Sequence, residues 1–266
     1  MRPLAALERE EARALDGLVV DLDDTVLDHG LLTERAYAAV FRAREAGLPI
    51  VVATGRPLGW AEVVARTWPI DGAIAENGAV AARREGSRLV RVDALSDEAR
   101  SERRARLLAL AETLVARFPS AALADDNALR RTDVTIDVAE ARAVPAAEVR
   151  ALVALAREAG VRTTVSSVHL HLSYDTHDKA SGTIAYLLAT RGVDPTRARS
   201  RWAFVGDSGN DAPCFAAFRT SFGVANVREH LAQLSVAPSY VAPEPRGQGF
   251  AAIVETLARL RATKSY

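Results

Sequence analysis

Cysteine is almost absent from this chain of 266 residues, because Cys214 is the single one. No intramolecular disulfide can therefore form. No apolar run approaches the ~20 residues that a membrane-spanning helix needs. Residues 1–17 mix Arg with Glu throughout and lack the apolar core of a signal peptide. We therefore expect a cytoplasmic protein that does not bind a membrane.

An excess of charge is also missing, since 34 basic residues balance 34 acidic ones. A chain without a net positive field has no general attraction to nucleic acid. The hydrophobic content of 49% is that of an ordinary globular protein. We expect no nucleic-acid partner and either a monomer or a homodimer.

Lysine is rare as well, because only Lys179 and Lys264 occur among the 34 basic residues. A compact ammonium and a planar guanidinium are not interchangeable at a tight site. Lys264 is close to the C-terminal end of the sequence, whereas Lys179 lies within the predicted fold, in the segment 177–182. Lys179 is therefore a candidate functional residue.

Two acidic segments each follow a short apolar run. Asp21–Thr25 (DLDDT) comes after Leu18–Val20, and Gly206–Asp211 (GDSGND) comes after Trp202–Val205. Such runs are typical of buried parallel strands. Since side chains alternate along a strand, Asp21 and Asp23 would point to the same side. Open α/β sheets bind ligands at the carboxyl ends of their strands.

The chain alternates between expected strands and expected helices in its first and last thirds. This pattern predicts an α/β fold with a Rossmann-like, parallel sheet. The expected strands are 18–22, 49–53, 72–75, 202–205 and 221–224. The expected helices are 34–46, 58–68, 178–191, 212–218 and 251–262, with a loop at 243–249.

The middle of the chain has a different pattern. Strands with one polar face are expected at 88–92, 130–138, 161–167 and 169–174, and helices at 97–118 and 145–159. This pattern is typical of an α+β unit. We predict an inserted α+β cap domain over 83–174, and a catalytic core formed by 1–82 and 175–266.

Four segments at the ends of strands or helices contain the chemistry expected of a phosphate site. They are Asp21–Thr25, Thr54–Arg56, the segment at Lys179, and Asp207–Asp211. Hard divalent ions such as Mg²⁺ take oxygen ligands, including one or two carboxylates and a phosphate. A hydroxyl and an ammonium group suit phosphate oxygens. This set of residues favours phosphoryl transfer.

In the same order, these segments resemble the four motifs of the haloacid dehalogenase superfamily. The insert after the third strand is similar to that of the Cof-type and sucrose-phosphate phosphatase-like subfamily, which has a large α+β cap. The resemblance implies that Asp21 is a nucleophile that forms an aspartyl-phosphate, and that Asp23 is the general acid and base. It implies a Mg²⁺ site formed by Asp21, Asp23 through its backbone carbonyl, Asp207 and Asp211.

The resemblance also implies how the substrate is held. The phosphoryl group would be bound by Thr54, Gly55 and Lys179, with Asn210 orienting Lys179 or the phosphate. Arg56 and Asn77 are candidates for substrate binding. Asp24 is expected to be solvated or to cap a turn. We interpret His169 and His171 as an exposed pair on one strand face, with a position above the active site as the alternative.

The sequence thus predicts a Mg²⁺-dependent phosphatase that acts on a small phosphate ester, with a sugar phosphate as the favoured substrate class. A phosphomutase would use the same aspartyl-phosphate and remains an alternative. A phospho-acceptor signalling module of the response-regulator type is a second alternative. Asp23 argues against it, because an acid two residues after the nucleophile speeds loss of the phosphoryl group.

Overall fold

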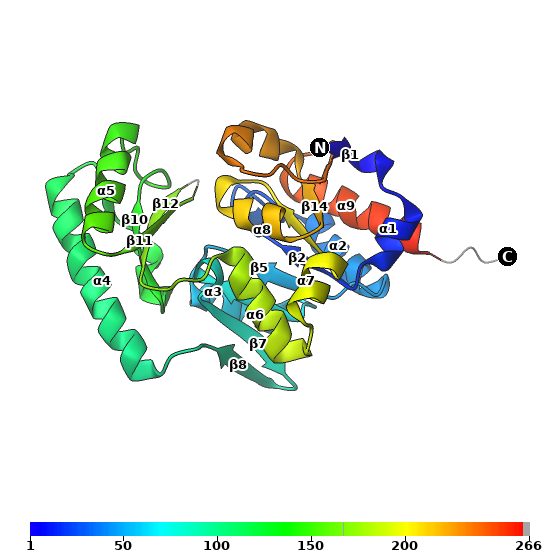
Figure 1. The fold of residues 1–266 in the computed structure, drawn as a ribbon, viewed down its shortest axis with the longest axis horizontal. Helices are drawn as coiled ribbons and strands as arrows, with labels where there is room; N and C mark the ends of the chain where they lie inside the picture. Colours follow the sequence, from blue (N-terminus) through cyan, green and yellow to red (C-terminus); the bar gives the residue numbers. More distant parts are fainter. Residues whose placement is uncertain (167, 263–266) are drawn as a thin grey trace.

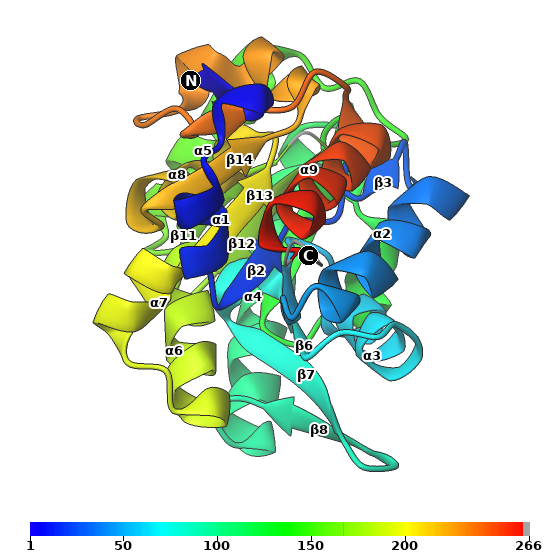
Figure 2. The same cartoon turned by 90° about the vertical axis from the view of Figure 1, so that its right-hand side faces the viewer.

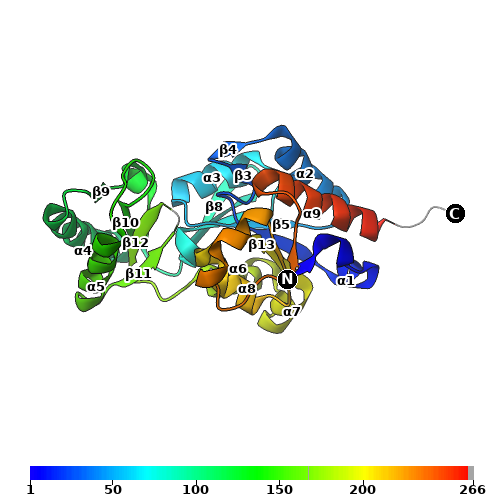
Figure 3. The same cartoon turned by 90° about the horizontal axis from the view of Figure 1, so that it is seen from above.

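The computed structural model describes residues 1–166 and 168–262. Two units lie side by side along its longest axis (Figure 1). One contains a large sheet with helices on both faces, and the other contains a small sheet with two helices on one side (Figure 3). This arrangement confirms the predicted α/β class with a Rossmann-like sheet.

The large sheet has nine strands within the described residues, and most of them are parallel. Its central strands are completely buried, as their continuous apolar runs predict. In spatial order the strands are β1 (Arg2–Pro3), β15 (Tyr240–Val241), β14 (Thr220–Gly223), β13 (Trp202–Gly206), β2 (Gly17–Val20), β5 (Ile50–Ala53), β6 (Gly72–Ala75), β7 (Val80–Glu85) and β8 (Arg88–Val92).

Helices cover the two faces of this sheet and bury a separate apolar cluster on each. Figure 2 shows the helices on either side of the strands. One face is covered by α1 (Arg9–Ala14), α2 (Glu34–Glu45), α3 (Leu58–Thr67) and α9 (Arg246–Arg261). The other is covered by α6 (Lys179–Arg191), α7 (Pro195–Arg201) and α8 (Ala212–Ala217). A short hairpin, β3 (Leu27–Asp28) and β4 (Leu31–Leu32), follows the first acidic segment.

The smaller unit, which we name the cap, has its own core of apolar side chains between its sheet and its helices. The strand order is β11-β12-β10-β9. Its elements are α4 (Asp97–Arg117), β9 (Ala122–Leu123), the 3-10 helix η3 (Asp125–Leu129), β10 (Asp133–Asp137), α5 (Ala146–Glu158), β11 (Arg162–Val165) and β12 (His169–Ser173). The strands expected at 161–167 and 169–174 are confirmed over the described residues as β11 and β12, which pair antiparallel.

The strands β7 and β8 pair with the large sheet, although the predicted insert begins at 83. The two connections between the units meet at the buried side chain of Arg100. Its guanidinium donates to Asp93 in the first connection and to Asp175 in the second. We therefore propose that the cap begins near 93–96 and ends near 174, so that residues 83–92 belong to the core.

Several short or Gly-rich elements differ from the prediction. The expected loop at 243–249 is wrong in part, because α9 begins at Arg246. Gly247 lies in its first turn, where a Cβ would come within 2.7 Å of the Val26 carbonyl oxygen. The elements α1, α7, β1 and β15 were not predicted. Among the described residues, no helix is long and apolar enough to cross a membrane.

Candidate active site

The two acidic segments meet because their strands are neighbours. Strands β2 and β13 are parallel, with Val20 opposite Val205. The next residue, Asp21, donates its backbone N–H to the Val205 carbonyl at 2.9 Å. Asp21 and Asp207 therefore leave the sheet at the same edge, at the carboxyl ends of adjacent strands.

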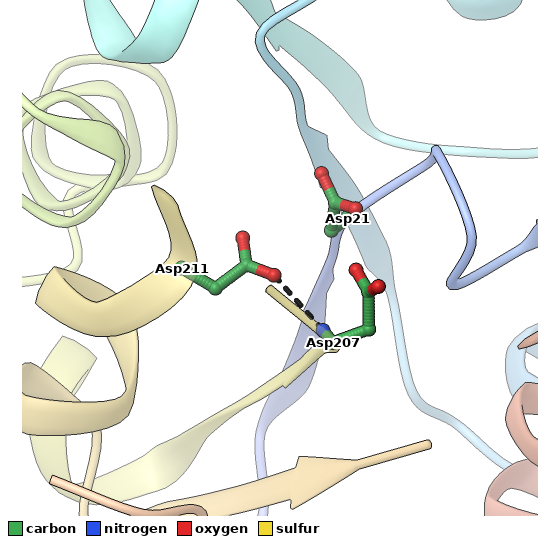
Figure 4. Close-up of side chains that lie close together, drawn as sticks. All are labelled: Asp21, Asp207 and Asp211. Carbon is green, nitrogen blue, oxygen red and sulfur yellow. Dashed lines mark hydrogen bonds between the residues drawn. The ribbon is translucent and has the colours of Figure 1, made fainter. Parts of the chain in front are cut away.

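Three carboxylates gather at this edge, as Figure 4 shows. Oxygen atoms of Asp21, Asp207 and Asp211 all lie within 4.8 Å of one another, and all three residues are buried. Asp211 belongs to the 3-10 helix η4 (Gly209–Asp211), which turns back toward β13. Its Oδ2 accepts from the backbone N–H groups of Asp207 and Ser208, which fixes the side chain.

Lys179 joins this cluster from the first turn of α6. Its ammonium lies 2.6 Å from Asp21 Oδ1 and 2.6 Å from Asp211 Oδ1, and only 1% of the residue is exposed. Burial alone would lower the pKa of Lys179, but the two carboxylates outweigh that effect and raise it. Lys179 is therefore held in its charged form.

The remaining charge is unbalanced. Burial raises the pKa of Asp21 to about 8, although Lys179 opposes the rise. Burial, together with the carboxylates of Asp211 and Asp21, raises the pKa of Asp207 to about 9. Three carboxylates and one ammonium, when all are ionised, leave two negative charges in a buried space. A divalent cation would remove this repulsion, and carboxylate oxygens are the ligands that Mg²⁺ prefers.

Two residues that sequence reasoning missed hold Asp207 in place. Thr25 donates its hydroxyl to Asp207 Oδ1 at 3.2 Å, and Asn226 donates its amide to Asp207 Oδ2 at 2.8 Å. The Asn226 amide also donates to the Asp24 carbonyl at 3.0 Å. Thr25 belongs to the first acidic segment, but Asn226 lies in the 3-10 helix η5 (Ala225–Gln233), which has no sequence signal of its own.

The segment after β5 lies beside the acidic cluster. Thr54 is buried, and its hydroxyl accepts the backbone N–H of Arg56 at 3.1 Å. The Thr54 carbonyl accepts the backbone N–H of Asn77 at 3.1 Å. Asn77 has a φ of +55°, and its buried Oδ1 has no hydrogen-bond partner among the described residues.

Asp23 is paired with Arg56 rather than with the three buried carboxylates. The guanidinium donates to both oxygens of Asp23 at 2.9 to 3.1 Å, and it also reaches Glu140 of the cap at 3.4 Å. The side chain of Asp23 is 32% exposed. The remaining predicted residue, Asn210, accepts from the Ser208 hydroxyl at 2.7 Å. Its predicted contact with Lys179 is not formed among the described residues.

His169 and His171 do not form an exposed pair. Both are buried, with 2% and 3% exposed, so that expectation is wrong. Their strand, β12, is a central strand of the cap sheet. His171 Nδ1 lies 2.8 Å from Asp133 Oδ2, and His169 Nε2 lies 2.8 Å from Glu140 Oε2. The alternative position, above the active site, is the one that the structure has.

A cavity of about 350 Å³ lies between the core and the cap. Its core side contains Asp21, Asp23 and Arg56, and its cap side contains Glu140 and His169. A cavity of this size falls within the range that small-molecule ligands occupy. The other lining residues are Asp24, His29, Gly30, Gly55, Arg130, Ala139, Ser166, Val168, His171, Ser208 and Asn210.

Residues 18–105 match the family of haloacid dehalogenase-like hydrolases. The matched region contains Asp21 and Thr54. This match supports the resemblance of residues 18–105 to the haloacid dehalogenase superfamily. Among curated proteins, none matches it in sequence.

Solved structures share this fold over nearly the whole chain. A Thermoplasma acidophilum protein is 18% identical, with a TM-score of 0.70 over 92% of this chain and 99% of that one. The sucrose-phosphatase of Synechocystis is 19% identical, with a TM-score of 0.65 over 92% and 98%. A phosphatase of the haloalkanoate (HAD) enzyme superfamily from Bacteroides thetaiotaomicron is 19% identical, with a TM-score of 0.62 over 92% of this chain and 95% of that one. At these identities the likeness concerns the fold.

Proposed function

We propose that the protein is a Mg²⁺-dependent phosphatase that hydrolyses a small phosphorylated metabolite, with a sugar phosphate as the favoured substrate class. The observation that carries this proposal is the cluster of Asp21, Asp207 and Asp211 beside the buried ammonium of Lys179. The Synechocystis relative was solved with sucrose and phosphate, which supports the choice of substrate class. The polar cap side of the cavity gives further support, because sugar hydroxyls need hydrogen-bonding partners.

In this proposal Asp21 attacks the phosphorus atom and forms an aspartyl-phosphate. Asp23 gives a proton to the leaving alcohol and then takes one from the attacking water. Asp21 and Asp207 would hold the Mg²⁺, together with the Asp23 backbone carbonyl. Both oxygens of Asp211 already accept hydrogen bonds, which favours an indirect role for it. The bound ion would neutralise the charge of the phosphate.

The other residues would hold the substrate. Thr54, Gly55 and Lys179 would bind the phosphoryl group. Asn77 remains a proposed substrate-binding residue, although its Oδ1 is closed to solvent in this structure. Arg56 would have to leave Asp23 before that acid could reach the leaving group, so substrate binding would rearrange this pair.

The experiment measures phosphate release from p-nitrophenyl phosphate and from a panel of sugar phosphates by the full chain. Wild-type protein is compared with Asp21→Asn, with Mg²⁺ or with excess chelator. We expect Mg²⁺-dependent release that the substitution abolishes while the circular dichroism spectrum is kept. Release that is equal in the wild type and in Asp21→Asn would contradict the assigned nucleophile.

A further inference from the structure

A buried carboxyl group outside the acidic cluster joins the core to the cap. It belongs to Glu76, in the turn between β6 and β7, and only 3% of the residue is exposed. Glu76 has a φ of +51°, and the next residue, Asn77, has a φ of +55°. Two consecutive non-glycine residues in the left-handed region are unusual. Such backbone strain persists only where surrounding contacts hold the conformation. Here the hydrogen bonds of the Glu76 side chain provide those contacts.

Five hydrogen bonds end on the two oxygens of this carboxyl group. Oε1 accepts the backbone N–H of Leu58, which opens helix α3 of the core, at 2.9 Å. Oε1 also accepts the backbone N–H of Arg131 at 2.9 Å. Oε2 accepts from the Thr132 N–H at 2.5 Å, the Thr132 hydroxyl at 2.6 Å and the Asp133 N–H at 3.0 Å. One core amide and four donors of the cap therefore share a single side chain.

The segment that Glu76 binds carries residues of the active-site cavity. Asp133 is the first residue of β10, and its carboxylate pairs with His171 at 2.8 Å and with Arg130 at 3.1 Å. Arg130 in turn donates to the Gly55 carbonyl at 3.0 Å, on the segment assigned to phosphate binding. The docking of residues 130–133 thus determines where His171 and Arg130 stand in the cavity.

We propose that Glu76 is a positioning residue that holds the cap closed over the phosphate site. It does not reach the acidic cluster itself, and its five donors leave no lone pair for a substrate. Two other contacts cross the cavity through charged side chains. Arg130 donates to the Gly55 carbonyl at 3.0 Å, and Arg56 forms a 3.4 Å ion pair with the partly exposed Glu140. Ion pairs of that kind contribute little. Glu76 makes four hydrogen bonds to the cap, more than either of these side chains makes between the two units, and we name it the latch.

Hydrogen exchange tests the latch without reference to catalysis. In Glu76→Gln, the amide group offers one acceptor oxygen and turns two N–H donors toward the remaining donors. We expect the amides of Leu58, Arg131, Thr132 and Asp133 to exchange roughly tenfold faster or more, because an exposed amide exchanges through the opened state. The Ile136 amide, inside the cap sheet, should change by less than about twofold.

Two further variants keep the test decisive. Glu85→Gln makes the same change on the exposed end of β7 and should leave all of these amides unaffected. Thr132→Val removes only the hydroxyl donor and should speed exchange at the same amides by a smaller factor, even if Glu76→Gln does not fold. Unchanged exchange in both latch variants, or equal acceleration at Ile136, would overturn the proposal.

A kinetic measurement, which rests on the proposed function, separates positioning from general damage. With p-nitrophenyl phosphate we expect Glu76→Gln to raise KM by about tenfold and to change kcat by less than about threefold, since the cap binds the ground state and the transition state alike. A loss of kcat at unchanged KM would overturn the positioning role. If the wild type shows no phosphatase activity, the proposed function fails while the exchange data still decide on the latch.

Discussion

At the scale of single residues, Lys179 is the charge that allows three carboxylates to share a buried space. It touches Asp21 and Asp211 directly and has almost no contact with solvent. An arginine carries the same charge but needs more room and a planar set of partners. Lys179 also stands out in a chain that uses Arg at nearly every other basic position.

The first prediction concerns this ammonium. Lys179→Ala should lower kcat/KM by roughly a thousandfold or more, because it leaves the phosphate and Asp21 without their buried counter-charge. Lys179→Arg should lose about a hundredfold, since the longer, planar group does not fit between the two carboxylates. Lys264→Arg, at the other lysine, serves as the control. A loss below about tenfold for Lys179→Ala would contradict the role.

The second prediction concerns pH. Burial, with a contribution from Asp133, raises the pKa of Glu76 from 4.5 to about 7, although the hydrogen bonds from Thr132 and Arg131 oppose the rise. The folded chain therefore binds this proton more tightly than the unfolded chain does. The resulting stabilisation is complete below pH 4.5 and is lost as the pH rises through about 7.

The measurement is urea unfolding of the wild type and Glu76→Gln at several pH values. The wild type should lose up to roughly 3 kcal/mol relative to the variant between about pH 4.5 and pH 7. Other titrating groups cancel in this difference. A difference that stays constant, or that grows with pH, would show that Glu76 does not have a raised pKa.

Sequence reasoning located Asp21, Asp207 and Lys179 because each lies at the end of an element with a strong local pattern. It could not find Asn226, whose contact with Asp207 joins segments 19 residues apart through a 3-10 helix. It also misjudged His169, because the alternation of a strand does not reveal which face a second unit will cover. Contacts of that kind depend on tertiary packing.

At the scale of elements, helix α6 sets the position of Lys179. Asp178 caps the helix by accepting the Ser181 N–H, and the Ser181 hydroxyl lies 2.9 Å from the Asp178 N–H. The helix also approaches the turn at Gly78 very closely. A Cβ on Gly182 would come within 2.2 Å of the Gly78 carbonyl oxygen, so only glycine fits there.

The third prediction compares two capping residues. Asp178 caps α6 and Asp194 caps α7, and each accepts from backbone N–H groups of its helix. Asp178→Ala and Asp194→Ala should each cost about 1 kcal/mol of stability in urea unfolding. Only Asp178→Ala should also lower kcat, because α6 carries Lys179 into the site. Equal activity in the two variants would show that the cap of α6 does not position Lys179.

Most strands and helices could be predicted, because their apolar periodicity is local. The pairing of β7 and β8 with the large sheet could not be predicted. Alternating polar and apolar residues at 88–92 fit the edge of either sheet, and only the register with β6 and β7 places them in the core. The start of α9 was predicted as a loop because Pro245, Gly247 and Gly249 are residues typical of loops.

At the scale of the whole molecule, the fold brings together segments that are far apart in the chain. Thr25 and Asp207 are separated by 182 residues, yet they share a hydrogen bond. The cap then closes the resulting site from the other side. The acidic cluster and the cavity under the cap therefore form only when segments that are distant in the chain fold together.

The fourth prediction follows from the repulsion within the cluster. Mg²⁺ should raise Tm, because it binds the folded site and not the unfolded chain. Saturation at about a hundred times Kd should add roughly 2.7 kcal/mol to the unfolding free energy. Asp207→Asn should lose most of this rise in a thermal melt, whereas Asp28→Asn, at a half-buried acid outside the cluster, should keep it. A Mg²⁺ effect of equal size in both variants would place the ion elsewhere.

The central claim is that Asp21 and Asp207, brought together from distant segments, bind one divalent cation, and that Asp21 is also the reactive carboxylate. The most direct measurement is a crystal structure with Mn²⁺ in place of Mg²⁺, in which anomalous scattering locates the ion. We predict one strong peak within roughly 2 Å of oxygens of both side chains. A well-ordered structure with Mn²⁺ bound elsewhere, or with Asp21 and Asp207 free of it, would contradict the account.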